Sequence, residues 1–197
     1  MKRNRNSNFT TQRMAIMAAL IAIQIVLARY LSIQASDTLR ISFETVPLAL
    51  AGMWLGPVGG VVVALVSDVL GTILSGYGIW FPPIALGPAL FAAICGWGTK
   101  YVFHSNLAKT RDAWKVILIT VVAGAINAFL IGIPTTTLYQ MIIVGKTESF
   151  WVLAAANFMS RLASKPAVIV VVAGLVALIH RAVYRPVISR IVRTNKK

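Results

Sequence analysis

Apolar residues fill this chain in six blocks, which short polar or turn-rich segments separate. The blocks cover residues 11–33, 46–55, 58–74, 84–103, 114–144 and 150–183. A helix needs roughly 20 apolar residues to cross about 30 Å of hydrocarbon, and most of the blocks approach or exceed that length. The pattern predicts an all-α membrane protein, a compact bundle of six transmembrane helices in one domain over residues 1–197.

Glycine and proline interrupt this pattern at particular places. Gly56-Pro57 separates the short second block from the third, because such dipeptides are typical of turns. The fifth block is too long for one straight span. Pro134 can kink or break it, since proline lacks the backbone donor that a helix needs. Pro166 lies inside the sixth block.

Lysine and arginine gather at three places along the chain. Fourteen of the 19 lie near the start of the chain, around the junction of the fourth and fifth blocks, or near the end of the chain: Lys2, Arg3, Arg5, Arg13, Lys100, Lys109, Arg111, Lys115, Arg181, Arg185, Arg190, Arg193, Lys196 and Lys197. The predicted outer segments contain only two basic residues, Arg40 and Lys146. Excess basic charge marks the cytoplasmic side, and six spans put all three clusters on one side. Both termini are therefore expected inside.

Composition agrees with a membrane protein. Hydrophobic residues make up 58% of the chain and charged residues 12%, and the mean hydropathy is +0.79. A net charge of +14 could indicate nucleic-acid binding, but no basic stripe with interleaved aromatics occurs. Attraction to the anionic headgroups of a lipid bilayer explains the charge better, so no nucleic acid is expected. The lone Cys95 excludes a disulfide framework.

The first block also resembles the apolar part of a signal peptide. It is longer than such a region, and no clear cleavage site follows it. We therefore expect a retained first helix.

Two cations interrupt the sixth block at helical spacing. Arg161 and Lys165 lie four residues apart, and Asn157 precedes Arg161 on the same helix face. Ionisable groups at membrane depth are costly and normally face a bundle interior or a watery cavity. We interpret this face as part of a binding cavity. The alternatives are a structural pair of Arg161 with Asp68, or snorkelling of Lys165 to the interface.

The fifth block carries an unusual polar run in its outer half. The run contains amide, hydroxyl and phenol groups: Asn127, Thr135, Thr136, Thr137, Tyr139 and Gln140. Such residues often only hydrogen-bond between helices. Beside Pro134, the mixture favours a cavity wall, and we select Asn127, Thr136 and Tyr139 as candidate binding residues.

The outer loops contain further candidates. Trp80 and Phe81 could form a lid that stacks on a flat ligand, although aromatic residues at this depth are often only interfacial anchors. Arg40 and Phe43 could close over the same mouth, with Arg40 pairing a carboxylate or remaining a solvated charge. On the first helix, small residues recur in two pairs, which permit close approach of a partner helix or packing inside the bundle: Ala15, Ala18, Ala19 and Ala22.

Motifs of catalysis are missing from the sequence. Gly145-Lys146-Thr147 resembles the end of a phosphate-binding loop, but Gln140 stands where that loop needs glycine. No H-E-x-x-H or G-x-S-x-G occurs. Asp68 is the only acid within the blocks, whereas a proton-driven carrier usually needs several. The sequence therefore predicts no enzyme, no metal and no cofactor.

Several strings resemble a known family. They are Leu39–Phe43, Pro47–Gly52, Gly56–Gly60, Asp68, the loop from Gly76 to Pro82, and Arg161. Together with the six blocks, they are similar to the substrate-binding S components of energy-coupling factor (ECF) vitamin importers, most of all the folate family. Phe81-Pro82-Pro83 replaces the Pro-Gly-Phe-Thr stretch usual in the folate type. The strings are therefore more specific for the family than for its vitamin.

The resemblance implies a mechanism. An S component of a prokaryotic cell membrane captures a vitamin outside, here folate or a reduced folate. It then docks on a transmembrane coupling (T) protein that is bound to two cytoplasmic ATPases, and ATP-driven toppling delivers the ligand inside. The alanine pairs match the family's contact with the coupling protein. Another vitamin (pantothenate, thiamin or a pyrimidine precursor), a stand-alone carrier and a structural membrane protein are the alternatives.

Overall fold

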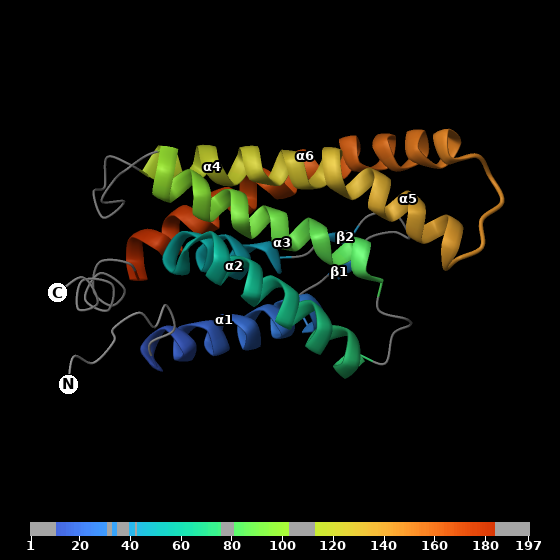
Figure 1. Ribbon diagram of the computed structural model, residues 1–197. Coiled ribbons are helices and arrows are strands. Elements are labelled where there is room, and N and C mark those ends of the chain that lie inside the picture. The colour runs from blue at the N-terminus through green and yellow to red at the C-terminus, as the bar shows by residue number, and fades with distance from the viewer. Residues whose placement is uncertain are drawn as a thin grey trace.

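The chain forms a helical bundle (Figure 1). The structure, a computed structural model, describes residues 11–30, 33–34, 40–41, 43–75, 81–102 and 113–183. Its elements are α1 (Thr11–Tyr30), β1 (Ile33–Gln34), β2 (Arg40–Ile41), α2 (Thr45–Ser75), α3 (Pro82–Trp97), the π-helical segments η1 (Gly98–Val102) and η3 (Ile126–Ile131), α4 (Ala113–Ala125), α5 (Gly132–Ile142) and α6 (Phe150–Val183). β1 and β2 pair antiparallel, with Gln34 opposite Arg40.

Four stretches of the described helices are long and apolar enough to cross a membrane: Thr11–Ala28, Thr45–Leu74, Ala113–Ile142 and Phe150–Val183. The expected helical fold, with apolar stretches of membrane-spanning length, is thereby confirmed. The first helix ends at Tyr30, before the expected residue 33, and α3 gives way to η1 at Gly98. Six crossings and the inside position of both termini stay predictions.

The element α2 contains a reversal at Gly56. This glycine has φ 85° and ψ 176°, a region that is open to glycine and closed to other residues. A Cβ on Gly60 would lie 2.8 Å from the Cα of Gly52, whereas eight residues of a straight helix span about 12 Å. The two arms therefore fold against each other, and the turn expected at Gly56-Pro57 is confirmed (Figure 1).

Small residues bring α2 and α3 into backbone contact. A Cβ on Gly52 would overlap the carbonyl oxygen of Ala92, and one on Gly96 would lie 2.6 Å from the nitrogen of Pro57. In a membrane, helices associate by such close packing, since lipid tails are as apolar as the side chains. Ala49, Ala92 and Cys95 are fully buried in this region, which forms the centre of the core.

The fifth block is not a single helix. The π-helical segment η3 separates α4 from α5 and lies just before Pro134, which cannot donate to the preceding turn. The expected interruption is therefore present, but it precedes the proline. Pro166, in contrast, lies within the continuous α6.

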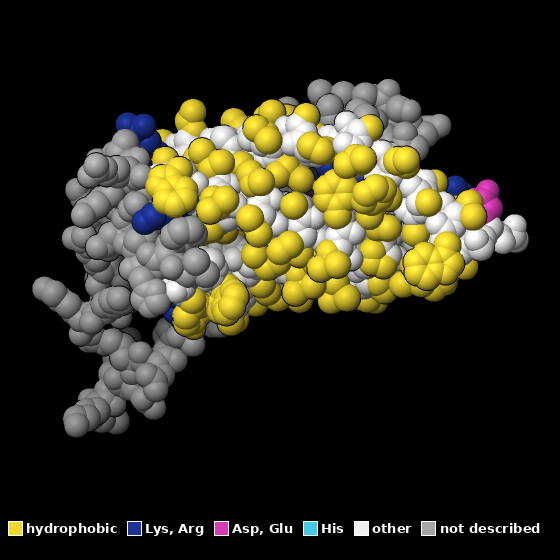
Figure 2. Space-filling view, turned by 90° about the horizontal axis from the view of Figure 1, so that it is seen from above, with side chains coloured by type: hydrophobic (Ala, Val, Ile, Leu, Met, Phe, Trp, Pro, Cys, Tyr) yellow, Lys and Arg dark blue, Asp and Glu magenta, His cyan; other side chains and the backbone are white. Residues whose placement is uncertain are grey.

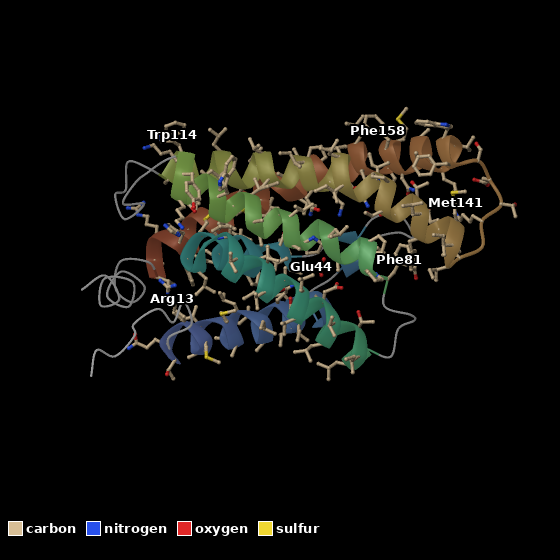
Figure 3. All side chains as sticks on the ribbon, viewed as in Figure 1. Arg13, Glu44, Phe81, Trp114, Met141 and Phe158 are labelled. Atoms are coloured by element: carbon tan, nitrogen blue, oxygen red, sulfur yellow. The ribbon has the colours of Figure 1, made fainter. Side chains whose placement is uncertain are left out.

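The two ends of the bundle differ in chemistry. α1 begins and α6 ends at the same end, where Arg13 and Trp114 lie, while Phe81, Met141 and Phe158 lie toward the other (Figures 1 and 3). Hydrophobic side chains cover the middle of the face in Figure 2, with Lys and Arg mainly at one end and Asp and Glu at the other. This polarity agrees with the basic end being cytoplasmic.

Candidate functional site

A cavity of about 220 Å³ lies among the helices of the bundle, lined by residues of α3, α4, η3, α5, α6 and the beginning of α2. Its apolar wall includes Ile84, Phe91, Val168 and Ile169. Polar side chains face it from several elements: Glu44, Thr45, Thr120, Asn127, Thr135, Thr136, Arg161 and Lys165. An apolar cavity with a few convergent polar groups is the usual form of a small-molecule site.

Arg161 reaches from α6 across to the neighbouring elements. Its Nη1 donates to the carbonyl oxygen of Ala128 at 3.0 Å, and its Nη2 donates to the Thr136 hydroxyl at 2.7 Å. A guanidinium carries five N–H donors, so the two bonds fix the group and leave donors for a ligand. Arg161 is not paired with Asp68 in the described part of the chain, which removes that alternative.

Two glycines make room for the polar groups of the cavity. A Cβ on Gly132 would overlap the Arg161 guanidinium, and a Cβ on Gly87 would lie 2.8 Å from Oδ1 of Asn127. Because both glycines also line the cavity, they allow these side chains to lie against helix backbone. The absence of a side chain at Gly87 and Gly132 therefore makes room in the cavity wall for Asn127 and Arg161.

Asn157 lies outside this cavity. Its amide nitrogen donates to the Thr137 hydroxyl at 3.1 Å and to Oε1 of Gln140 at 2.9 Å, so it joins α6 to α5. Thr137 is fully buried and donates to the carbonyl of Ile133 at 2.8 Å. These contacts match the helix–helix role that polar residues often have in membranes. A binding role for Asn157 stays a prediction.

The end of the bundle opposite Arg13 and Trp114 holds an aromatic pair (Figure 3). The rings of Phe81 and Tyr139 meet edge to face, with centroids 5.8 Å apart, and join the start of α3 to α5. Neither residue lines the cavity. Phe43 is half-buried and packs against the core. Trp80 lies outside the described residues, and of Arg40 only the backbone pairing in β2 is described.

Glu44 was not among the candidate residues. It stands just before α2, and the sequence places it in a polar segment that we expected outside the membrane. Instead it lines the cavity together with Lys165, which had snorkelling as its alternative. The only sequence signal for Glu44 is that the chain has so few acids: five in total.

Comparison with known proteins identifies the family. Residues 12–192 match the family described as "ECF transporter, substrate-specific component". The chain belongs to this family.

This S component is similar to two folate transporters and to one solved structure. It is 32% identical over 133 residues to the "Folate transporter FolT" of Clostridium novyi, a match that covers 68% of this chain and 70% of that protein. Its identity to the FolT of Leuconostoc mesenteroides is 26% over 114 residues, covering 58% of this chain and 60% of the other. A crystal structure of "FolT bound with folic acid" superimposes with a TM-score of 0.63 and 26% identity, covering 84% of this chain and 93% of that one.

The alanines of α1 in this S component share one face. The exposed residues on this face are Ala15, Ala18, Ala19 and Ala22. The opposite side of the helix is buried and contains Met17, Leu20 and Gln24. The Ser67 hydroxyl donates to Oε1 of Gln24 at 2.5 Å, which ties the buried face to α2. The alanine face is thus available to a partner helix, and its contact with the coupling protein stays a prediction.

No group of three metal-binding side chains occurs among the residues that the structure describes. The residues that line the cavity offer hydrogen-bonding groups, charge and apolar surface.

Proposed function

We propose that this S component binds folate or a reduced folate from the outside, in the cavity that Arg161 crosses. The observation that carries the proposal is the fixed guanidinium, bonded to Ala128 and Thr136 at the wall of an otherwise largely apolar cavity. The names of its relatives and the structural likeness to FolT with folic acid support folate as the vitamin.

The chemistry of the cavity suits the pterin ring. A pterin is flat and has donors and acceptors along one edge, and the apolar walls at Phe91 and Ile169 can hold its faces. Arg161 can donate to ring acceptors, while the Glu44 carboxylate can accept from the 2-amino group and the neighbouring ring N–H. Asn127 can do either, because an amide both donates and accepts.

Volume and charge together suggest an orientation. The cavity of about 220 Å³ is smaller than the ~300–1,000 Å³ typical of small-molecule sites. The ring end therefore occupies the cavity, and the glutamate tail extends toward the outer end, where Phe81 and Tyr139 lie. This placement keeps the two negative tail carboxylates away from the Glu44 carboxylate.

Delivery requires a partner. As a multi-pass protein of a prokaryotic cell membrane with both termini inside, the S component docks on a transmembrane coupling protein and two cytoplasmic ATPases. The exposed alanine face of α1 is the proposed contact. ATP hydrolysis by that module supplies the energy, and this chain itself catalyses no reaction.

Isothermal titration of the detergent-purified protein tests the ligand. We expect tight binding of folate, with thiamin and pantothenate as controls that give no heat. Heat with a control vitamin and none with folate would overturn the proposal. Mass spectrometry of the small molecules that co-purify with the protein gives an independent identification.

A further inference from the structure

The π-helical segment η3 decides the direction in which Asn127 points. In an uninterrupted α-helix, the nine residues from Asn127 to Thr136 turn the chain by about 900°, so the two side chains would lie on opposite sides. Instead, both residues line the cavity of about 220 Å³. The N–H of Gly132 donates to the carbonyl of Asn127, five residues back, which is the wider turn of a π-helix. This turn takes up one extra residue and brings Asn127 round to the side of Thr136.

Asn127 lies next to the guanidinium of Arg161 at this wall. Nη1 of Arg161 donates at 3.0 Å to the carbonyl of Ala128, the residue that follows Asn127, and Nη2 donates to Thr136. A Cβ on Gly132 would overlap Nη1 of Arg161 and lie 2.9 Å from the carbonyl oxygen of Asn127. The amide of Asn127 and the guanidinium can therefore contact neighbouring atoms of one ligand.

The amide of Asn127, unlike that of Asn157, is not bonded to a neighbouring helix. Asn157 donates to Thr137 and Gln140, whereas no hydrogen bond joins the Asn127 side chain to a residue that the structure describes. Its Oδ1 lies against Gly87 of α3, where a Cβ would be 2.8 Å away. An amide exchanges its oxygen for its NH2 by a half turn about its last bond. Asn127 can therefore offer the cavity either an acceptor or a donor.

The proposed ligand has one ring atom that changes between these two roles. The 2-amino group and N3–H suit the Glu44 carboxylate, and the 4-oxo group suits Arg161. The next atom along the ring is N5. In folate N5 is an acceptor, whereas in tetrahydrofolate it carries a hydrogen and donates. A side chain with one fixed role would pair with one form and leave a buried polar group unpaired with the other.

We infer that Asn127 determines which oxidation states of folate this S component accepts. Its amide donates to N5 of folate and, after a half turn, accepts from N5–H of tetrahydrofolate. A guanidinium could not serve both forms at this atom, because it has no acceptor. The inference rests on the proposed function and names the residue that extends the ligand range to both forms.

Isothermal titration of the detergent-purified protein with folate, tetrahydrofolate and 5-deazafolate tests this role. In 5-deazafolate a C–H replaces N5, so the ring keeps its shape and its pyrimidine edge. We expect the wild type to bind folate and tetrahydrofolate with similar affinity under anaerobic conditions. It should bind 5-deazafolate about tenfold more weakly than folate, from the loss of one hydrogen bond.

The variant Asn127→Leu removes the amide with little change in size. It should weaken folate and tetrahydrofolate by about tenfold each, and leave 5-deazafolate nearly unchanged, since that ligand has no partner for the amide. Thr135→Val is the matched control. It also removes a polar group from the cavity wall, but the Thr135 hydroxyl donates to the carbonyl of Ile131 at 2.8 Å. This control should keep the difference between folate and 5-deazafolate.

Two results would overturn the inference while leaving the proposed function in place. One is an equal loss of all three ligands in Asn127→Leu, which would mean that the amide only supports the cavity wall. The other needs no variant to fold: a wild type that binds folate but rejects tetrahydrofolate, or that binds 5-deazafolate as tightly as folate. A wild type that binds none of the three ligands would overturn the proposed function, and this inference with it.

Discussion

Replacing Arg161 with methionine removes a fixed charge from the proposed vitamin cavity while keeping an unbranched apolar side chain. The variant loses the bonds to Ala128 and Thr136 and every bond that the guanidinium makes to the ligand. Charge-assisted hydrogen bonds contribute about 1.5–3 kcal/mol, so folate affinity should fall by roughly one to two orders of magnitude.

Stability should change much less than affinity in this variant. The carbonyl of Ala128 and the hydroxyl of Thr136 lose a donor, which destabilises the fold. At the same time, the cost of holding a charge at membrane depth disappears. These effects oppose each other, so a large loss of affinity with a small shift in melting temperature is the expected signature of a ligand-binding residue.

Isothermal titration with folate and thermal unfolding on the same preparation measure both quantities. Lys146→Met serves as the control, because it removes an exposed cation from the turn between α5 and α6, away from the cavity. Since Arg161 and Asp68 are not paired, adding Asp68→Asn should restore neither quantity. An Arg161→Met protein that binds folate as tightly as the wild type would refute the assignment of the site.

Three further predictions concern other parts of the molecule. Glu44→Gln should weaken folate binding several-fold by calorimetry, yet leave an analogue without the 2-amino group nearly unaffected; equal effects on both ligands would remove Glu44 from the ring contact. Ala18→Trp should keep folate binding but abolish ATP-dependent uptake in vesicles holding the full complex. Leu130→Trp, an equally bulky change at a residue of η3 that is 72% exposed, should leave that uptake intact. Uptake unchanged by Ala18→Trp would argue against the α1 contact. Gly56→Ala should lower stability by about 1–3 kcal/mol in denaturant unfolding, since φ 85° with ψ 176° strains any side chain; no loss would mean that the turn relaxes.

The helices and the reversal in α2 could be predicted because local chemistry decides them. Apolar blocks of spanning length have few alternatives in a membrane, and Gly56 adopts a backbone conformation that other residues avoid. The position of η3 could not be predicted. Pro134 weakens the helix over the whole preceding turn, and packing then decides where the π-helical segment forms. Here the segment ends next to Gly132, which accommodates Arg161.

The candidate site, too, could be predicted from the sequence only in part. Arg161, Asn127 and Thr136 were predictable as cavity residues, since polar groups inside apolar blocks need an unusual environment. Asn157 satisfied the same criterion but bonds to Thr137 and Gln140, and sequence cannot separate a helix–helix bond from a ligand bond. Glu44 was missed for the opposite reason, because an acid in a polar segment needs no special explanation.

The arrangement of α1 bears on how binding and delivery can be separate steps. Every described residue that lines the proposed vitamin cavity comes from α2 to α6 or from Glu44 just before α2, and none comes from α1. The buried face of α1 packs on α2, partly through the bond between Ser67 and Gln24, while its alanine face points away from the bundle. A partner can therefore dock on α1 without touching the ligand. Because α1 packs on α2, and α2 begins at the cavity with Thr45, α2 is a structural route by which docking on α1 could reach a ligand in the cavity.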